Sequence, residues 1–271
     1  MPTINTNVNA LFAQNALKVN DRNMTKAMQQ LATGSKVNSS ADDAAGLSSA
    51  TSMTAQIRGM NQAIRNANDA MSMLQTAEGA MTEQTNMLQR MRELAMQATT
   101  STYNSTQLGY LDTEFQALDT QINNIASNTK WNGSTVLASA TTQSFVVGAA
   151  GTETVTVNLA ATDTTTGLAT TALAVSSAAS AAAAVTAIDT ALASLSSARA
   201  KLGAGINQLT YAADNLTNTS ANMQASRSQI MDTDYATATS NLARAQIIQQ
   251  AATAMLAQAN QAPASVLALL K

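Results

Sequence analysis

The amino-acid sequence predicts a mainly α fold: a long antiparallel helical bundle or coiled coil, with paired N- and C-terminal helices and a small β-hairpin at the tip. Three observations lead to this prediction. The two prolines are Pro2 and Pro263, so 260 residues run between them without a helix-breaking ring. The chain is 45% hydrophobic but only 3% aromatic, and small or unbranched side chains suit closely packed helices. Apolar residues recur with a heptad period in several segments.

The longest heptad pattern covers residues 185–230. Apolar side chains recur there at alternating intervals of three and four residues, with three polar interruptions. The pattern consists of Val185, Ile188, Leu192, Leu195, Arg199, Leu202, Ile206, Leu209, Ala213, Leu216, Ser220, Met223, Arg227 and Ile230. Such a pattern predicts a coiled-coil helix, and at 1.5 Å per residue it would be roughly 70 Å long. Gly203 and Gly205 weaken it locally, each by about 1 kcal/mol relative to alanine.

Two further heptad patterns predict helices that pack against this one. They run from Ile57 to Ala95 and from Leu108 to Ile125, with a polar turn at 99–104 between them. Three helices of this kind bury one another as a bundle, expected to comprise residues 45–137 and 185–230.

The segment between the bundle helices, residues 138–184, predicts a hairpin and a loop. Residues 145–147 and 154–159 have the composition of two short strands on either side of a glycine-containing turn. The Thr-, Ala- and Ser-rich residues 160–184 follow as a loop.

The two ends, residues 1–44 and 231–271, predict a second helical region. Their apolar stripes are thin and rich in alanine, and they include Ala10, Leu17, Met24, Leu31, Tyr235, Leu242, Ile248 and Leu256. Helices that bury so little are marginal alone. We therefore expect them to be disordered in a lone chain and to fold against other chains. The alternative is an ordinary helix pair within a stable monomer.

Composition excludes several classes of function. The net charge is −2 and the basic residues are scattered, so we expect no nucleic-acid partner. Without Cys or His, we expect no metal, no cofactor and no catalytic residues. The N-terminus lacks the features of a signal peptide. No window of 18 residues is wholly apolar, so we expect no membrane insertion.

Several motifs at both ends resemble those of the bacterial flagellin family. The matching segments are Ile4-Asn5-Thr6-Asn7, residues 31–38, Asp42-Asp43-Ala44-Ala45-Gly46, residues 65–69, 75–80 and 88–95, Trp131-Asn132-Gly133, Asp234-Tyr235-Ala236, and residues 244–250 and 256–261. Together the resemblance covers roughly residues 1–137 and 185–271. It implies a short flagellin that lacks the large outer domains of many family members.

This resemblance implies a structural subunit that polymerises with itself into the extracellular flagellar filament and serves swimming motility. The terminal helices would form the inner tube and the bundle the next layer. The chain would be exported unfolded by the flagellar type III apparatus and assembled under a cap, next to the hook-filament junction proteins. A cytoplasmic export chaperone would bind apolar positions near the C-terminus: Leu242, Ile247, Ile248, Leu256, Leu267, Leu269 and Leu270.

The resemblance also points to two sets of functional residues. Gln89, Arg90, Arg92, Glu93, Leu94, Gln97 and Glu114 match positions of subunit contact or of recognition by the vertebrate Toll-like receptor for flagellin. The alternative reading is an amphipathic helix with an ordinary surface pair between Arg90 and Glu93. Gly34 and Gly46 bracket a loop with Asp42 and Asp43, which we interpret as a hinge and also as a helix N-cap.

Three other functions compete with the filament subunit. A hook-filament junction protein resembles flagellin at both ends and is the main alternative. An enzyme is disfavoured, because the chain has no His general base and no Cys nucleophile, and acid pairs such as Asp42–Asp43 lack a pocket-forming context. A secreted effector or adhesin built on coiled coils would not account for so extended a resemblance.

Overall fold

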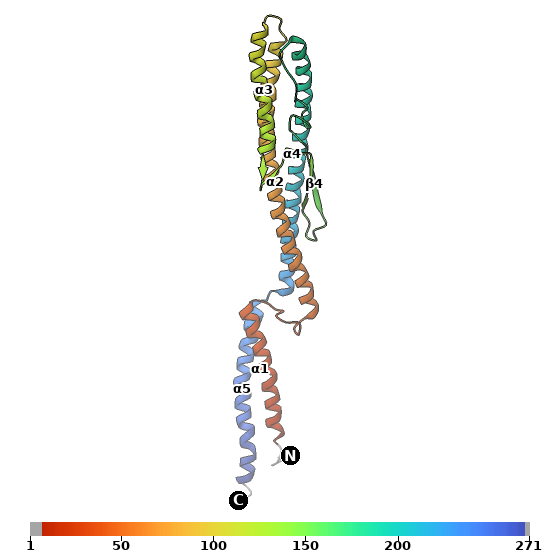
Figure 1. Ribbon diagram of the computed structural model, residues 1–271. Helices are drawn as coiled ribbons and strands as arrows, with labels where there is room; N and C mark the ends of the chain where they lie inside the picture. The colour runs from red at the N-terminus through yellow and green to blue at the C-terminus, as the bar shows by residue number, and fades with distance from the viewer. Residues whose placement is uncertain (1–6, 269–271) are drawn as a thin grey trace. The chain divides into compact units, whose positions relative to one another are not determined.

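The chain is mainly α-helical, as predicted. The computed structural model describes residues 7–268, with side chains as far as Gln261. The elements are α1 (Val8–Thr33), α2 (Ala44–Ala98), α3 (Ser105–Asn128), β1 (Lys130–Trp131), β2 (Ser134–Thr135), β3 (Thr141–Val146), β4 (Thr154–Leu159), α4 (Ala178–Met231) and α5 (Tyr235–Ala268) (Figure 1). They form two compact units, Gln56–Ala221 and Met1–Ala55 with Asn222–Lys271.

In the unit of residues 56–221, α2, α3 and α4 lie side by side and share one apolar core (Figure 1). The heptad pattern of α3 is confirmed, because Leu108, Phe115 and Ile122 are buried at intervals of seven residues. The polar turn at 99–104 is also confirmed, and Asn104 and Gln107 form a reciprocal capping box at the start of α3.

Between residues 181 and 209, the buried seam of α4 differs from the predicted one at every second position. Its members there are Ala181, Ala184, Ile188, Ala191, Leu195, Ala198, Leu202, Gly205 and Leu209, whereas the predicted positions Leu216 and Ser220 further along are buried as expected. The predicted positions Leu192, Arg199 and Ile206 lie next to this seam and are half-buried. The positions that differ are occupied by alanine or glycine, and such small side chains allow the neighbouring elements to approach α4 closely. By length and composition α4 would be apolar enough to cross a membrane, but its seam packs into the bundle core.

Gly205 is a close-approach position, whereas Gly203 is not. A Cβ added to Gly205 would lie 2.7 Å from Cγ2 of Val157 on β4, while one added to Gly203 would meet nothing within 4 Å. We expect Gly203→Ala to stabilise the chain by about 0.5–1 kcal/mol, because alanine favours the helix. Gly205→Ala should be less stable than Gly203→Ala by about 2 kcal/mol, because overpacking outweighs that gain. Urea unfolding of both variants checks this, and equal midpoints would contradict the contact.

The hairpin consists of β3 and β4, paired antiparallel from Thr141 with Leu159 to Val146 with Thr154. Its position differs from the expected tip. The hairpin turn lies against α2, where the carbonyl oxygen of Ala149 is 2.5 Å from the place a Cβ of Gly59 would take. The end of the bundle is instead the turn that follows Ala98. A two-stranded hairpin is marginal alone. It lies along the helices, where Val157 and Leu159 of β4 are buried and Phe145 of β3 is half-buried.

The loop before α4 is held by side chains of α3. Oδ1 of Asp119 accepts a hydrogen bond from the Thr170 hydroxyl, and Oδ1 of Asp112 accepts one from the backbone N–H of Val175, both at 2.8 Å. Burial raises the pKa of Asp119.

Helix α4 begins at Ala178, seven residues earlier than predicted. A second, very short pair, β1 with β2, was not predicted.

In the other unit, α1 and α5 pair with each other along their lengths (Figure 1). The sequence predicted that they would be disordered in a lone chain, whereas the structure has both as helices of one pair. Their contact is nevertheless thin, because within the described side chains of the pair only Asn20, Ala27, Ala238 and Ala245 are buried. The predicted stripe residues Ala10, Leu17, Met24, Leu31, Leu242 and Leu256 are half-buried, and Tyr235 and Ile248 are exposed.

Candidate subunit-contact surfaces

The first candidate surface is a charged cluster on α2 and α3. Arg90 donates to Glu93 at 3.1 Å on its own helix and to Glu114 of α3 at 3.0 Å. Glu114, which has the larger effect, and Glu93 raise the pKa of Arg90 through these hydrogen bonds. All three side chains are about half-exposed or more, so water screens the pairs and they add little stability. The predicted Arg90–Glu93 pair is therefore present, and Glu114 extends it to a second helix.

Arg92 belongs to the same helix but is directed to the other neighbour. Its guanidinium donates to Asp189 of α4 at 2.6 and 3.3 Å, and this contact lowers the pKa of Asp189. Gln89 is exposed, and Gln97 donates to the Tyr103 hydroxyl at 2.9 Å. The exposed face of α2 thus presents two amides, Gln89 and Gln97, and two arginines whose side chains are held by α3 and α4.

Leu94 does not belong to this surface. Its side chain is 1% exposed and lies in the bundle core. The side chain of Leu94 is therefore not available for direct contact with another molecule, in contrast to the role implied by the resemblance. The reason is the heptad register of α2, in which Met91 and Ala95 are also buried.

The second candidate is the predicted hinge, where two connecting segments pair with each other. Helix α1 ends at Thr33, and the capping residue Gly34 that follows adopts a left-handed conformation with φ +69°, as is common at helix C-termini. The backbone N–H of Lys36 then donates to Met231 at 2.6 Å, and that of Thr233 donates to Gly34 at 3.0 Å. The connection from α1 to α2 is therefore tied to the connection from α4 to α5.

Asp42 and Asp43 have different roles in this loop. Oδ1 of Asp42 lies 2.8 Å from Nζ of Lys26, and Oδ2 accepts hydrogen bonds from Asn38 and Ser39. Asp43 caps α2 by accepting from the backbone N–H groups of residues 45 and 46 at 3.1 and 2.9 Å. A Cβ at Gly46 would collide with Asp43. The loop is thus fixed by side-chain contacts on both sides.

Acid should weaken the unit that contains this loop. The Lys26 ammonium and the loop hydrogen bonds lower the pKa of Asp42 in the folded chain. A depressed pKa contributes stability that is present above the unfolded value of about 3.9 and is lost as the pH falls through the lower folded value. We expect the melting temperature of this unit to fall below about pH 4, with a smaller decrease in Asp42→Asn. Thermal melts between pH 2 and pH 6 check this; identical pH profiles would contradict it.

The third candidate is the α1–α5 pair itself. Asn20 lies in its seam, is 6% exposed, and donates from Nδ2 to the carbonyl oxygen of Ala245 at 2.8 Å. Asn7 donates in the same way to Ala259 at 2.7 Å. Between these two hydrogen bonds α1 advances from Asn7 to Asn20, whereas its partner on α5 moves back from Ala259 to Ala245. The two helices are therefore antiparallel. Ala27 and Ala238, one heptad from Asn20 and Ala245, are buried likewise.

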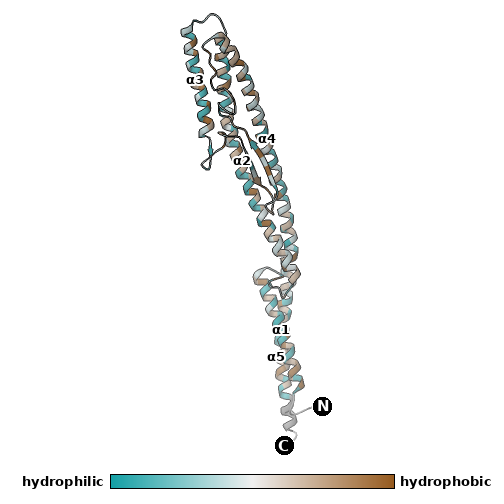
Figure 2. Ribbon diagram, turned by 45° about the vertical axis from the view of Figure 1, so that its right-hand side comes forward, coloured by the Kyte–Doolittle hydropathy of each residue, from teal (hydrophilic) through white to brown (hydrophobic). Residues whose placement is uncertain are grey.

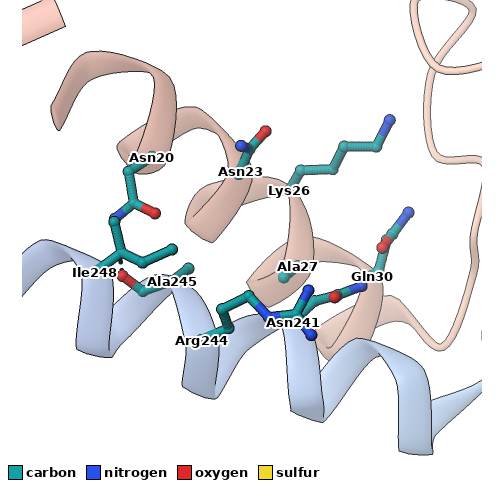
Figure 3. A pocket seen from close by; sticks show the side chains of 9 residues that line it. All are labelled: Asn20, Asn23, Lys26, Ala27, Gln30, Asn241, Arg244, Ala245 and Ile248. Atoms are coloured by element: carbon teal, nitrogen blue, oxygen red, sulfur yellow. Dashed lines mark hydrogen bonds between the residues drawn. The ribbon is translucent and has the colours of Figure 1, made fainter. Parts of the chain in front are cut away.

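One edge of this pair is hollowed along its length, and we call this hollow the terminal groove. It consists of neighbouring cavities that share lining residues. Its lining includes Phe12, Ala16, Val19, Asn23, Lys26 and Gln30 of α1 and Asn241, Arg244, Ile248, Ala252 and Met255 of α5. The part near the hinge is polar, with Asn23, Lys26, Asn241 and Arg244 around a cavity of about 330 Å³ (Figure 3). The part toward the chain ends is apolar, although α1 and α5 as whole helices carry both hydrophobic and hydrophilic residues (Figure 2).

Sequence reasoning missed most of the groove. It singled out the seam positions and Ile248, but not Phe12, Val19 or Met255, which are 69%, 47% and 66% exposed. The signal was present, because Phe12, Ala16 and Val19 are spaced by four and three residues, one position before the α1 seam.

Some predicted residues lie outside the described side chains, namely Ile4 to Thr6, Leu267, Leu269 and Leu270. Within the part of the chain that the structure describes, no three acidic side chains form a metal site.

Comparison with known proteins agrees with these features. The model of the bacterial flagellin N-terminal helical region matches residues 4–142, and that of the C-terminal helical region matches residues 185–270. A flagellin of Halalkalibacterium halodurans is 40% identical over 99% of both chains. The crystal structure of Bacillus cereus flagellin is 34% identical and covers 60% of this chain and 94% of its own, with a TM-score of 0.51.

A second solved structure is similar to this chain in fold alone. A structure of a putative flagellar hook-associated protein from Vibrio parahaemolyticus has a TM-score of 0.60 over 70% of this chain and all of its own, at 13% identity. The two family models, by contrast, leave only residues 143–184 of the chain between them. With paired ends, a helical bundle and family motifs on both sides of a short hairpin, this chain belongs to the bacterial flagellin family, the family of flagellar filament subunits.

Proposed function

We propose that the chain polymerises with copies of itself into an extracellular flagellar filament that serves swimming. One observation carries this proposal. Of the twelve large apolar side chains that are exposed in the described structure, nine lie on α1 and α5: Val8, Leu11, Phe12, Val19, Met28, Tyr235, Ile247, Ile248 and Met255. Apolar surface concentrated in this way marks an interaction site. Neighbouring copies would cover it.

Growth on filament fragments tests this function. Purified chain added to sonicated filament fragments of the same protein should lengthen them, as measured by electron microscopy. A chain that stays monomeric on such fragments would rule out the filament subunit. A hook-filament junction protein, the main alternative, would bind the fragment ends and stop their growth.

Export and assembly partners follow from membership of the family. We propose that the flagellar type III apparatus exports the chain unfolded, that a cytoplasmic chaperone covers the apolar positions of α5 before export, and that the cap and the hook-filament junction proteins are its neighbours. Two features support this. The α1–α5 pair buries few side chains, so its unfolding costs little, and exposed residues such as Ile247 and Ile248 fit a helix-binding groove.

We also propose that the vertebrate Toll-like receptor for flagellin recognises the monomer through the Arg90 cluster. Arg90→Ala should lower receptor signalling, because it removes the cation that joins α2 to Glu114. A cell reporter assay with purified monomer measures this. Arg65→Ala, another exposed arginine of α2 outside this cluster, is the matched control. Signalling that is unchanged by Arg90→Ala would contradict receptor recognition and leave the filament function unaffected.

A further inference from the structure

The methionines of the chain differ widely in accessibility. The sequence contains 14. Met81 and Met91 are fully buried in the bundle core, whereas Met28, Met96 and Met255 are 45%, 50% and 66% exposed. A thioether reacts with a peroxide only where the oxidant can reach its sulfur. Met255, the most exposed of those named here, lies in the terminal groove.

The surroundings of Met255 are almost wholly apolar. It lines a hollow of about 410 Å³ together with Phe12 and alanines of both helices. Among the described residues that line this hollow, Asn9 alone has a polar side chain. Phe12 is 69% exposed, so both large side chains of the hollow face solvent in the single chain. In the proposed filament, a second copy of the chain is the occupant that would cover them.

We propose that Met255 is an oxidation site that controls docking of the next copy into the terminal groove. In the free chain, the thioether sulfur attacks one oxygen of a peroxide and the O–O bond breaks. The sulfur becomes a sulfoxide, losing two electrons, and hydrogen peroxide is reduced to water. The inference rests on the proposed function, since it assigns the groove to a second copy.

The sulfoxide opposes docking because of the groove's composition. Its oxygen is a strong hydrogen-bond acceptor, and water satisfies it while the groove is open. A docked copy excludes that water and leaves few donors, and an unsatisfied buried acceptor is costly. We expect the concentration of chain needed for filament growth to rise about tenfold or more, since each tenfold step corresponds to about 1.4 kcal/mol. Docking also shields the sulfur, so Met255 should be oxidised at least about tenfold more slowly in filaments than in free chains.

The experiment compares oxidised and untreated full-length chain. Monomer is treated with hydrogen peroxide, the sulfoxides are located by peptide mass mapping, and growth on filament fragments is measured. Treated wild type should carry the sulfoxide at Met255 and grow poorly, and incubation with methionine sulfoxide reductases should restore growth. Met255→Leu keeps the size and apolarity of the side chain but cannot form a sulfoxide, so peroxide treatment should leave its growth at the level of the untreated variant. Met28→Leu is the matched control, because it leaves Met255 oxidisable and should remain sensitive.

The outcomes separate this inference from the proposed function. Failure of untreated chain to grow would contradict the filament subunit itself. If untreated chain grows, three results would overturn the role of Met255: normal growth of chain oxidised at Met255, loss of growth in treated Met255→Leu equal to that of wild type, or equal oxidation rates of Met255 in filaments and in monomers.

Discussion

Ala238→Glu is expected to abolish filament growth while leaving the bundle folded. Ala238 is 4% exposed, in the α5 seam of the terminal pair. A glutamate there would bring a carboxylate between two helices and four residues from Asp234, the acidic side chain that caps α5. An unpaired buried charge costs several kcal/mol, and the thin α1–α5 contact cannot offset a loss of that size.

The measurement combines growth on filament fragments with thermal melting followed by circular dichroism. Thr239→Glu is the matched control, because it adds the same charge one residue later, at an exposed position. We expect Thr239→Glu to grow filaments and Ala238→Glu to form none. The melting transition of the bundle should be the same in both. Normal growth of Ala238→Glu would show that the terminal pair is not needed for assembly.

Much of the fold follows from heptad spacing alone, but the depth of burial does not. The spacing correctly predicted Ile188, Leu195, Leu202 and Leu209 as core residues of α4. It placed the alternate positions one residue too far along the chain, because a hydropathy pattern favours large side chains. In the structure, alanines and Gly205 occupy these positions, and the missing side chain of Gly205 is what permits its close contact with Val157 of the hairpin. The sequence reading took Gly205 as a weakness of the helix, whereas it is a packing site.

Contacts between distant segments were beyond sequence reasoning for a different reason. Asp112 and Asp119 lie outside the heptad pattern of α3, yet they accept hydrogen bonds from residues 175 and 170. Nothing in their local pattern identifies these partners, since backbone N–H and hydroxyl donors occur throughout the loop. The hinge was partly predictable, because Gly34 and the acidic residues signal a helix end and a helix start. That Asp42 pairs with Lys26 of α1 required the fold.

Leu94→Ala is expected to destabilise the bundle by about 3 kcal/mol, as is typical for removing a buried leucine side chain. Leu94 is 1% exposed and belongs to the core. Met96→Ala, two residues further along α2 at a half-exposed position, should change stability by less than about 0.5–1 kcal/mol. Urea unfolding of the purified monomers measures both effects. Equal and small losses would mean that Leu94 is not a core residue in solution.

This difference separates a core role of Leu94 from a contact role. At low temperature, where Leu94→Ala remains folded, it should support filament growth and receptor signalling like the unmodified chain, because its side chain does not reach the surface. Arg90→Ala should show the opposite behaviour, with nearly unchanged stability and lower signalling, because its ion pairs are exposed and weak. If folded Leu94→Ala lost signalling as Arg90→Ala does, the α2 surface would have to rearrange on binding. A family motif that contains both residues therefore combines two physical roles, and stability measured beside activity distinguishes them.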